Sequence, residues 1–595
     1  MTSRSGTAFF TATLVDTRAP QVHAVVKPVA DLIAANLRDY AAHSFAVAPA
    51  LCAPLAGATQ KGAHTVVFRI SILVVALLSL VAGLWPKGFH VFIQSGLAVV
   101  SVRFGWFYLL AVFATLVFLI YLLFSRFANL RIGGEDAEPE FSNASWMSML
   151  FAAGMGIGLV FWGAAEPVSH YLAPPEGLAP QSILAARASM RYVFFHWGLH
   201  PWAIYALVGL AMSWFMFNRQ GRGLISDLLQ PLIGHRHTGW IGHFVNILAI
   251  VSTALGVATT LGFGTLQISA GLERVFGIPA STLTQMSVIT VAFVLYMAST
   301  TSGVTRGIKW LSNGNLALAV LLLLMILVLG PVSFIFDIFT TTLGAYLSQL
   351  VSMSLRMSPF TASTWVQDWT IFYWAWWISW SPFVGIFIAR ISKGRTVREF
   401  VLGVVIAPSL LGFLWFSVFG GAAMWEQMFG NGQMVAAAQS GYQNVLFALL
   451  DTYPAATFLA GLTILLLVIF FVTSADSAVL VLATMSSPER GDPPVSRRII
   501  WGVSIAVIAA ALLLAGGLDA LQSALIITAF PFAVLLVLIM WSLYRVLDAE
   551  YVRQRQLSLR TRHAIERWLQ RDSEAAAAIA AASRDQADQQ DKAQP

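Results

Sequence analysis

The sequence has few charged residues for its length. Only 11% of its 595 residues are Asp, Glu, Lys or Arg, whereas 58% are hydrophobic. A soluble globular protein is about one quarter charged and about half apolar. Too little charge is therefore available to cover a soluble fold of this size. The composition excludes an ordinary soluble protein and indicates a protein embedded in a lipid bilayer.

Cysteine and the common catalytic motifs are also scarce. The single cysteine, Cys52, cannot form an intramolecular disulfide, so the redox compartment stays undetermined. The sequence contains neither HExxH nor GxSxG, which leaves little support for an intramembrane enzyme built on Glu166, His196 and His200. We therefore expect no enzymatic activity and no cofactor other than a coupling ion.

Long apolar runs recur along the chain. Each contains about 20 residues, which is enough for an α-helix to cross the hydrocarbon core of a bilayer. The runs predict twelve transmembrane helices, near residues 66–86, 104–127, 143–171, 191–217, 240–272, 282–302, 311–337, 366–390, 399–425, 455–484, 498–516 and 520–545. The predicted fold class is therefore an all-α polytopic membrane protein.

Basic residues are concentrated in alternate loops between these spans. If the N-terminus is cytoplasmic, the cytoplasmic loops carry fourteen Lys or Arg residues and the outer loops carry six. This bias predicts that both termini are cytoplasmic and that the protein lies in the inner (plasma) membrane. The net charge of +7 then fits a membrane surface, and we expect no nucleic-acid partner.

Polar tails flank the predicted membrane domain. We expect a cytoplasmic N-terminal tail at 1–64, a transporter domain at 65–545, and a C-terminal tail at 546–595 that is helical and then disordered. Residues 340–357 carry apolar side chains near helical spacing, which favours an amphipathic helix at the outer membrane surface over a plain loop.

Glycines interrupt the third predicted span. Residues 154–158 read Gly-Met-Gly-Ile-Gly at mid-membrane depth. Glycine weakens a helix by about 1 kcal/mol relative to alanine. The run could serve only for close helix packing, but a broken helix also frees backbone N–H and C=O groups that can bind an ion. We favour an unwound binding segment here.

Tryptophans lie in the middle of the eighth predicted span. Trp376, Trp377 and Trp380 cover about 100° of one helix face, at about 100° per residue. Interfacial tryptophans would lie at the ends of a span. Mid-membrane placement favours a box of aromatic rings that binds a quaternary ammonium, at about 2 kcal/mol or more per desolvated contact. Pro382 and Gly385 predict a helix break just beyond.

The fourth predicted span repeats this aromatic pattern. On a continuous helix, Trp197, Trp202 and Tyr205 would spread over about 140° of one face. A single aromatic residue in a span more often packs than binds a ligand. Two such clusters beside two helix breaks favour a binding site.

The tenth predicted span contains hydroxyls and a carboxylate. Thr473 and Ser474 could bond back to helix carbonyls, or they could supply oxygen ligands to a small cation together with carbonyls of an unwound helix. Asp476 is interpreted as the one carboxylate plainly within a span, and we expect it to anchor neighbouring helices rather than to relay a proton.

The spans from the third onward divide into two sets of five, at about 143–337 and 366–545. The first helix of each set carries an interruption. Matching interruptions in two halves predict inverted repeats with a substrate site near the membrane midplane. The sequence thus predicts a carrier of a small solute.

These motifs resemble those of the betaine/carnitine/choline transporter family, and in particular its sodium-coupled glycine betaine symporters. The resemblance rests on residues 154–158, 196–205, 374–382 and 473–477, and it covers about 65–545. It implies a LeuT-like fold of two inverted five-helix repeats after two extra N-terminal helices. It also implies a homotrimer.

The resemblance further implies a role for individual residues. The implied substrate site comprises a central aromatic box of Trp197, Trp202, Tyr205 and Trp377, an exit path with Trp376 and Trp380, and glycine-rich backbone near Met155 for the substrate carboxylate.

One sodium site is implied by residues that all match the family pattern. Its ligands would be the carbonyls of Ala152, Met155 and Phe470 and the hydroxyls of Thr473 and Ser474.

A second implied sodium site departs from the family pattern. Thr253 and Phe383 are present, but Val257 stands where a second threonine is expected, so one ligand oxygen is missing. No arginine occurs in the fifth span before Arg274, which argues for ion coupling, and no aspartate interrupts the glycine motif, which favours a zwitterionic substrate.

The expected function is sodium-coupled import of glycine betaine or a related compatible solute. Accumulation of this solute would provide osmoprotection. A choline, carnitine, ectoine or proline carrier of the same family, including one coupled to protons, stays open as an alternative. A membrane-stress sensor that transports nothing is a further alternative. The expected partners are a small zwitterionic or quaternary ammonium solute and the lipid membrane.

Overall fold

The computed structural model describes residues 57–154, 156–175, 177–302, 305–361, 363–487 and 492–591. Within these residues, ten helical segments are long and apolar enough to cross a bilayer. The same residues form helices and no β-strand, apart from an isolated β-bridge between Arg131 and Thr396. An all-helical polytopic membrane protein is therefore confirmed, whereas the predicted tail at 1–64 falls almost wholly outside the described residues.

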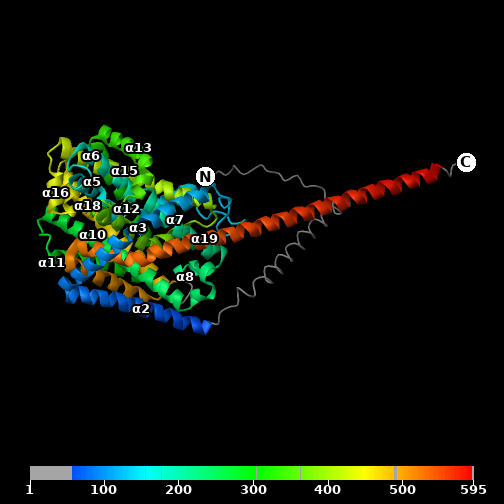
Figure 1. Cartoon of the computed structure of the whole chain (residues 1–595), viewed down its shortest axis with the longest axis horizontal. Helices are drawn as coiled ribbons and strands as arrows, with labels where there is room; N and C mark the ends of the chain where they lie inside the picture. The colour runs from blue at the N-terminus through cyan, green and yellow to red at the C-terminus, as the bar shows by residue number, and fades with distance from the viewer. Residues whose placement is uncertain are drawn as a thin grey trace, which may run out of the picture. The chain divides into compact units, whose positions relative to one another are not determined.

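The helices follow one another along the chain with short connections (Figure 1). In the first half they are α2 (Gly57–Leu84), α3 (Pro86–Phe124), α4 (Asn143–Gly154), α5 (Ile157–Leu172), α6 (Ile183–Trp197), α7 (Leu199–Ser213), η1 (Trp214–Asn218), α8 (Ile225–Leu228), α9 (Gln230–Ile233), η2 (Gly234–Thr238), α10 (Trp240–Phe276) and α11 (Thr282–Ser302). In the second half they are α12 (Thr305–Leu329), α13 (Val332–Ser354), η3 (Val366–Ile371), α14 (Phe372–Ile391), α15 (Val397–Phe429), α16 (Met434–Ser440), η4 (Tyr442–Asn444), α17 (Val445–Leu450), α18 (Ala456–Met485) and α19 (Val495–Asp591).

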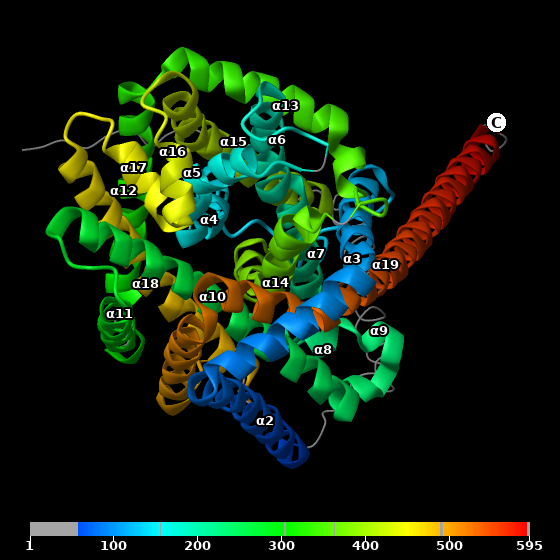
Figure 2. The same ribbon diagram turned by 60° about the vertical axis from the view of Figure 1, so that its left-hand side comes forward.

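The seventh predicted span ends earlier than expected, and the amphipathic helix begins earlier. α12 ends at Leu329, and α13 begins at Val332 and continues to Ser354. Pro331 separates them, because proline has no backbone N–H to continue the α12 hydrogen-bond ladder. The predicted surface helix at 340–357 is therefore the second part of α13, which lies along the outside of α6 and α15 (Figure 2).

The last two predicted spans belong to a single long helix that changes direction. Gly516 and Gly517 inside α19 have non-helical backbone angles, and Gly517 has a φ of 60°. Positive φ favours glycine, because a side chain would clash with its own backbone there. The turn lies between the spans predicted at 498–516 and 520–545, and α19 then continues to Asp591. The total of twelve spans and the repeat arrangement stay predictions.

The eighth predicted span is not broken at Pro382, and this prediction was wrong. α14 runs as a helix from Phe372 to Ile391 with Pro382 inside it. Proline cannot donate to the carbonyl four residues earlier, which is that of Ile378. The Ser381 hydroxyl donates to this carbonyl over 2.7 Å and takes the place of the missing bond.

Gly385 allows α14 to approach α7 closely instead of breaking α14. A Cβ at this position would lie 3.3 Å from the backbone nitrogen of Gly209 and 2.9 Å from Cγ1 of Val208. Small residues on facing helices allow two backbones to pack closely in a membrane. The aromatic residues of α14 are thereby held against those of α7.

Candidate functional site

The third predicted span is broken at its glycines, as expected. α4 ends at Gly154 and α5 begins at Ile157, while Gly156 between them is extended with φ −163° and ψ −178°. A Cβ at Gly156 would have no other atom within 4 Å, so open space lies beside this unwound residue. Met155, expected at the substrate and at sodium, lies outside the described residues.

The fourth predicted span is also broken, which the sequence interpretation missed. α6 ends at Trp197, α7 begins at Leu199, and Gly198 between them has φ −95° and ψ −127°. A Cβ on Gly198 would lie 2.5 Å from the carbonyl oxygen of Phe194. The helical arithmetic that placed Trp197 on one face with α7 therefore does not apply. Pro201, in the first turn of α7, was a signal of a helix start.

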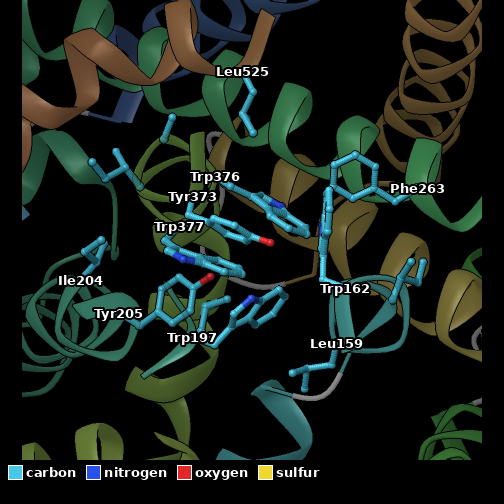
Figure 3. Packing of buried hydrophobic residues seen from close by; sticks show 14 of the residues in the cluster. Leu159, Trp162, Trp197, Ile204, Tyr205, Phe263, Tyr373, Trp376, Trp377 and Leu525 are labelled. Carbon is cyan, nitrogen blue, oxygen red and sulfur yellow. The ribbon is translucent and has the colours of Figure 1, made fainter. Parts of the chain in front are cut away.

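The break brings the aromatic residues of α6, α7 and α14 together (Figure 3). The ring centroids of Trp197 and Trp377 lie 4.8 Å apart at 69°, and Trp376 stacks on Trp377 at 4.8 Å and 11°. Tyr205 meets Trp377 edge-on at 6.2 Å, and Trp202 meets Tyr205 at 5.5 Å. All four residues of the predicted box thus lie in one cluster, and Trp376 borders it.

The four predicted box residues are almost, but not fully, enclosed. Trp197, Trp202, Tyr205 and Trp377 keep between 5 and 7% of their surface exposed, although they lie deep among the helices. This cluster of rings is suited to binding a quaternary ammonium, because the π-faces of aromatic rings are negative and attract a cation.

Trp380 lies outside this cluster. Its ring contacts that of Phe383 at 5.3 Å, and its Cδ1 would lie 2.9 Å from a Cβ on Gly256 of α10. Its indole nitrogen is buried without a hydrogen-bond partner among the described residues. The structure therefore places Trp380 with Phe383, one turn of α14 beyond the cluster.

Tyr373 belongs to the cluster and was missed. Its ring lies 5.6 Å from that of Trp197 and is nearly parallel to that of Trp377 at 5.9 Å and 26°. Tyr373 is four residues before Trp377 on one helix, so the two share a face, and this spacing was readable in the sequence. Phe416 of α15 also contacts Trp197, at 5.0 Å.

Hydrogen bonds hold the two stacked indoles of α14 in place. Nε1 of Trp377 donates to the carbonyl of His196 over 2.9 Å, and Nε1 of Trp376 donates to the hydroxyl of Thr260 over 3.1 Å. The carbonyl of His196 is one of the last of α6, where carbonyls have no partner within the helix. The break at Gly198 therefore also supplies an acceptor that fixes Trp377.

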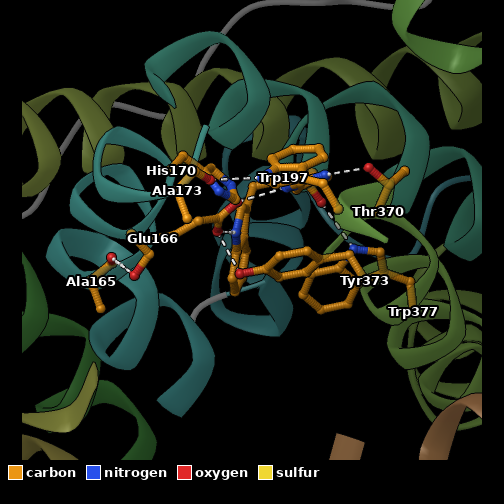
Figure 4. A network of polar contacts seen from close by, with 11 residues as sticks. Ala165, Glu166, His170, Ala173, Trp197, Thr370, Tyr373 and Trp377 are labelled. Carbon is orange, nitrogen blue, oxygen red and sulfur yellow. Dashed lines mark hydrogen bonds and ion pairs between the residues drawn. The ribbon is translucent and has the colours of Figure 1, made fainter. Parts of the chain in front are cut away.

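Glu166 lies behind the cluster and accepts hydrogen bonds from four side chains (Figure 4). Its Oε2 accepts from Trp197 Nε1 at 2.7 Å and from the Tyr373 hydroxyl at 2.5 Å. Its Oε1 lies 2.7 Å from His196 Nδ1 and 3.1 Å from His170 Nε2. Glu166 is wholly buried inside α5, so the interpretation of Asp476 as the one carboxylate within a span was wrong.

The same residues offer three potential metal ligands. One ligand atom each of Glu166, His170 and His196 lies within 4.8 Å of the others. Both histidines are hydrogen-bonded to Oε1 of Glu166, and His196 Nε2 also contacts the Thr370 hydroxyl at 3.0 Å. A carboxylate that also holds an indole and a phenol is more consistent with a network that orients the cluster than with a metal centre.

Thr473, one of the predicted sodium ligands of α18, is hydrogen-bonded to its own helix. The Thr473 hydroxyl donates to the Ile469 carbonyl over 2.9 Å and lies 3.3 Å from the Phe470 carbonyl. Ser474 next to it is partly buried. Met155, whose carbonyl would be a further ligand, lies outside the described residues, so the assembled sodium site stays a prediction.

Thr253, one of the residues expected at the second sodium site, has a hydroxyl without a hydrogen-bond partner among the described residues. Oγ1 of Thr253 is fully buried and has no hydrogen-bond partner among the described residues. Val257, one turn later on α10, is also buried and supplies no oxygen. A buried polar atom without a partner is costly and uncommon.

Asp476 anchors two helices, as expected. The Thr300 hydroxyl of α11 donates to its carboxylate, and Arg498 donates to the Thr300 carbonyl over 3.3 Å. The carboxylate thus links α18 to α11, away from the aromatic cluster.

Comparison with known proteins finds a family model and relatives that match most of the chain. Residues 66–552 match the family model of betaine/carnitine/choline family transporters. The chain is 45% identical to a glycine betaine transporter of Bacillus subtilis, over 81% of this chain and 94% of that protein. It is 44% identical to an ectoine/hydroxyectoine transporter of Virgibacillus pantothenticus, over 81% of this chain and 96% of that protein.

A third relative has a different named substrate. The chain is 40% identical to a high-affinity choline transport protein of Escherichia coli, over 82% of this chain and 73% of that protein. These relatives are transporters and not enzymes, in agreement with the absence of catalytic motifs. With its aromatic cluster, its broken third span and this match, the chain belongs to the betaine/carnitine/choline transporter family.

Proposed function

We propose that this protein is a secondary symporter that imports glycine betaine, or a related compatible solute, together with sodium across the inner membrane. The aromatic cluster at the meeting point of α6, α7 and α14 carries this proposal. Stacked and edge-on indoles gather there, buried among the helices. A trimethylammonium group fits such a site, because it is cationic yet too weakly hydrated to need hydrogen-bond partners.

The glycine break next to the cluster suits the other end of a zwitterion. A Cβ on Gly158 would lie 2.7 Å from Cη2 of Trp376 and 3.0 Å from Cη2 of Trp197, so the first turn of α5 touches the rings. The N–H groups of a first helical turn have no partners within the helix and attract anions. The substrate carboxylate would therefore lie at this break, near Met155, with the ammonium among the rings.

Sodium coupling is proposed through one well-matched site. The ligands would be the carbonyls of Ala152, Met155 and Phe470 and the hydroxyls of Thr473 and Ser474. Oxygen donors of this kind suit a small hard cation. The Thr473 hydroxyl could keep its bond to the Ile469 carbonyl, because a hydroxyl that donates its proton still has lone pairs for a cation. A second ion at Thr253 and Phe383 lacks an oxygen at Val257, so a single sodium is proposed.

Further features of the proposal concern the arrangement in the membrane. Twelve spans, two inverted five-helix repeats at about 143–337 and 366–545, and cytoplasmic termini would follow the family pattern, as would a homotrimer. Trp376 and Trp380 would line the exit toward the cytoplasm. Rocking of the first two helices of each repeat would alternate access to the site.

Related substrates are the alternatives. Relatives named for glycine betaine, ectoine and choline have similar identities of 45, 44 and 40%. Choline, carnitine, ectoine or proline could therefore replace glycine betaine, and protons could replace sodium. The uninterrupted glycine motif at 154–158 favours a solute with its own carboxylate over choline.

Uptake of labelled solutes tests the proposal. A bacterial strain without its own compatible-solute carriers would express the chain and receive each labelled solute with and without a sodium gradient. We expect accumulation of glycine betaine that depends on sodium. Uptake indifferent to sodium would contradict the coupling, and a flat assay for every solute would favour the sensor alternative.

A further inference from the structure

We propose that Glu166 is a positioning residue that sets the preference of the aromatic cluster for a positively charged group. It would do so by holding Trp197 and Tyr373 and by placing a fixed negative charge behind their rings. This inference rests on the proposed function, because it concerns how that site selects its substrate.

The geometry makes Glu166 the common partner of both rings. Oε2 accepts the indole proton of Trp197 at 2.7 Å and the phenol proton of Tyr373 at 2.5 Å. Trp197 comes from α6 and Tyr373 from α14, so one carboxylate of α5 fixes rings from two other helices. The rings lie 5.6 Å apart at 65°, and each contacts Trp377 (Figure 4).

The hydrogen-bond pattern is that of a carboxylate and not of a carboxylic acid. An ionised carboxylate only accepts hydrogen bonds, and four side chains surround Glu166 with N–H or O–H groups. In the tautomer in which His196 donates from Nδ1, its Nε2 accepts from the Thr370 hydroxyl, 3.0 Å away. In this tautomer His196, Trp197 and Tyr373 are neutral donors, so none of these three cancels the negative charge of Glu166.

This charge acts on a bound cation in two ways. Hydrogen bonds to a carboxylate pull the indole and phenol protons outward, which leaves more electron density on the rings and strengthens their attraction for a cation. The charge also acts directly through a medium of low dielectric constant, in which the attraction between opposite charges is stronger than in water. A purely structural carboxylate would hold the rings in place without making the site prefer charge.

A pair of isosteric ligands separates these two roles. Glycine betaine and 3,3-dimethylbutanoate have the same shape, but the second has a carbon atom in place of the ammonium nitrogen. Each unlabelled ligand would compete with labelled glycine betaine uptake at one fixed sodium concentration. The ratio of the two inhibition constants measures the charge preference and is independent of how much protein reaches the membrane.

The variant Glu166→Gln keeps the size and one acceptor oxygen but removes the charge. We expect its charge preference to fall at least about tenfold relative to the original chain, with 3,3-dimethylbutanoate binding no more weakly than before. Asp476→Asn is the matched control. It makes the same chemical change in another buried carboxylate within a span, which contacts Thr300 and not the cluster, so its preference should not change.

A loss of affinity that is equal for both ligands would overturn the inference and assign Glu166 a structural role. If Glu166→Gln does not reach the membrane, Tyr373→Phe decides, because it removes one donated proton and leaves the carboxylate and the ring. Its charge preference should fall by a smaller factor, and an unchanged preference would overturn the inference. An original chain that takes up no trimethylammonium solute would instead contradict the proposed function, and the inference with it.

Discussion

The aromatic cluster and the predicted ion site differ in how far they are assembled. In the cluster, Trp376 and Trp377 are stacked, and the indole N–H of each has an acceptor. On α18 and α10, by contrast, Thr473 bonds to its own helix, and the Thr253 hydroxyl is buried without a partner among the described residues. The indoles of the cluster thus have partners on other helices, whereas among the described residues these two hydroxyls have no partner outside their own helices.

The difference follows from the chemistry of the side chains. Aromatic rings are large and rigid, and packing alone fixes them in a binding geometry. A threonine hydroxyl in a membrane helix has a carbonyl of the preceding turn always within reach, so it donates its proton there and its position is set by its own helix. We expect ion binding to organise the second region and substrate binding to change the first very little.

The largest expected effect comes from removing a central ring. In Trp377→Leu the site loses a cation–π contact of about 2 kcal/mol, so the affinity for glycine betaine should fall about 30-fold. Direct binding of labelled glycine betaine to purified protein checks this. Trp501→Leu is the control, because Trp501 is another buried indole and donates to the Ser486 hydroxyl outside the cluster. Equal affinities in the two variants would mean that the cluster does not bind the ammonium.

A methyl group pushed into the preformed cluster should act next most strongly. A Cβ in Gly158→Ala would lie 2.7 Å from Cη2 of Trp376, and these rings have little freedom to move. Overpacking costs about 1–3 kcal/mol, so the KM for glycine betaine should rise about tenfold. Gly461→Ala on α18, where no atom lies within 4 Å of the new Cβ, should leave KM unchanged. A normal KM in Gly158→Ala would indicate a cluster that adapts freely and is not preformed.

Removal of a hydroxyl from the predicted sodium site should change the sodium dependence of betaine binding and leave the aromatic cluster unchanged. Thr473→Val keeps the shape and removes one proposed ligand, so half-saturation should require several-fold more sodium while maximal betaine binding persists. Thr463→Val is a close control, since this threonine bonds the Leu459 carbonyl of the same helix over 2.8 Å and has no proposed ion. If both variants respond alike to sodium, Thr473 serves only its helix.

The sequence predicted some parts of the fold and the site but not others, as the breaks expected at Gly156 and at Pro382 show. Long apolar runs predict the transmembrane helices, because a helix needs about 20 apolar residues to cross the hydrocarbon core. The break at Gly156 follows from three glycines in five residues. Pro382 looked like an equal signal, but the Ser381 hydroxyl replaces the missing hydrogen bond and α14 continues. A helix break depends on whether the freed backbone groups find another partner, and a local pattern does not state this.

The residues that were missed depend on contacts between distant parts of the chain. Gly198 breaks its helix where a Cβ would clash with Phe194 and Phe413, and Phe413 is known to be near only once α15 is in place. Glu166 was considered for catalysis alone. Its importance arises from Trp197 on α6 and Tyr373 on α14, which meet it only in the folded protein. A stricter use of the rule that a carboxylate within a span is functional would have found it.

The smallest expected effect comes from a variant that gives the Thr253 hydroxyl a partner, as the indole N–H groups of the cluster already have. Val257→Thr adds a hydroxyl one turn along α10 from the unpartnered Thr253 oxygen, with almost no change in volume. Two facing oxygens can share a sodium ion that one holds poorly. The dependence of uptake on sodium concentration should then become steeper, while KM for glycine betaine at saturating sodium stays the same. Val257→Ala, which adds no oxygen, is the comparison. An unchanged steepness in Val257→Thr would mean that Thr253 and Phe383 no longer form part of an ion site, so that a single sodium drives the proposed transport.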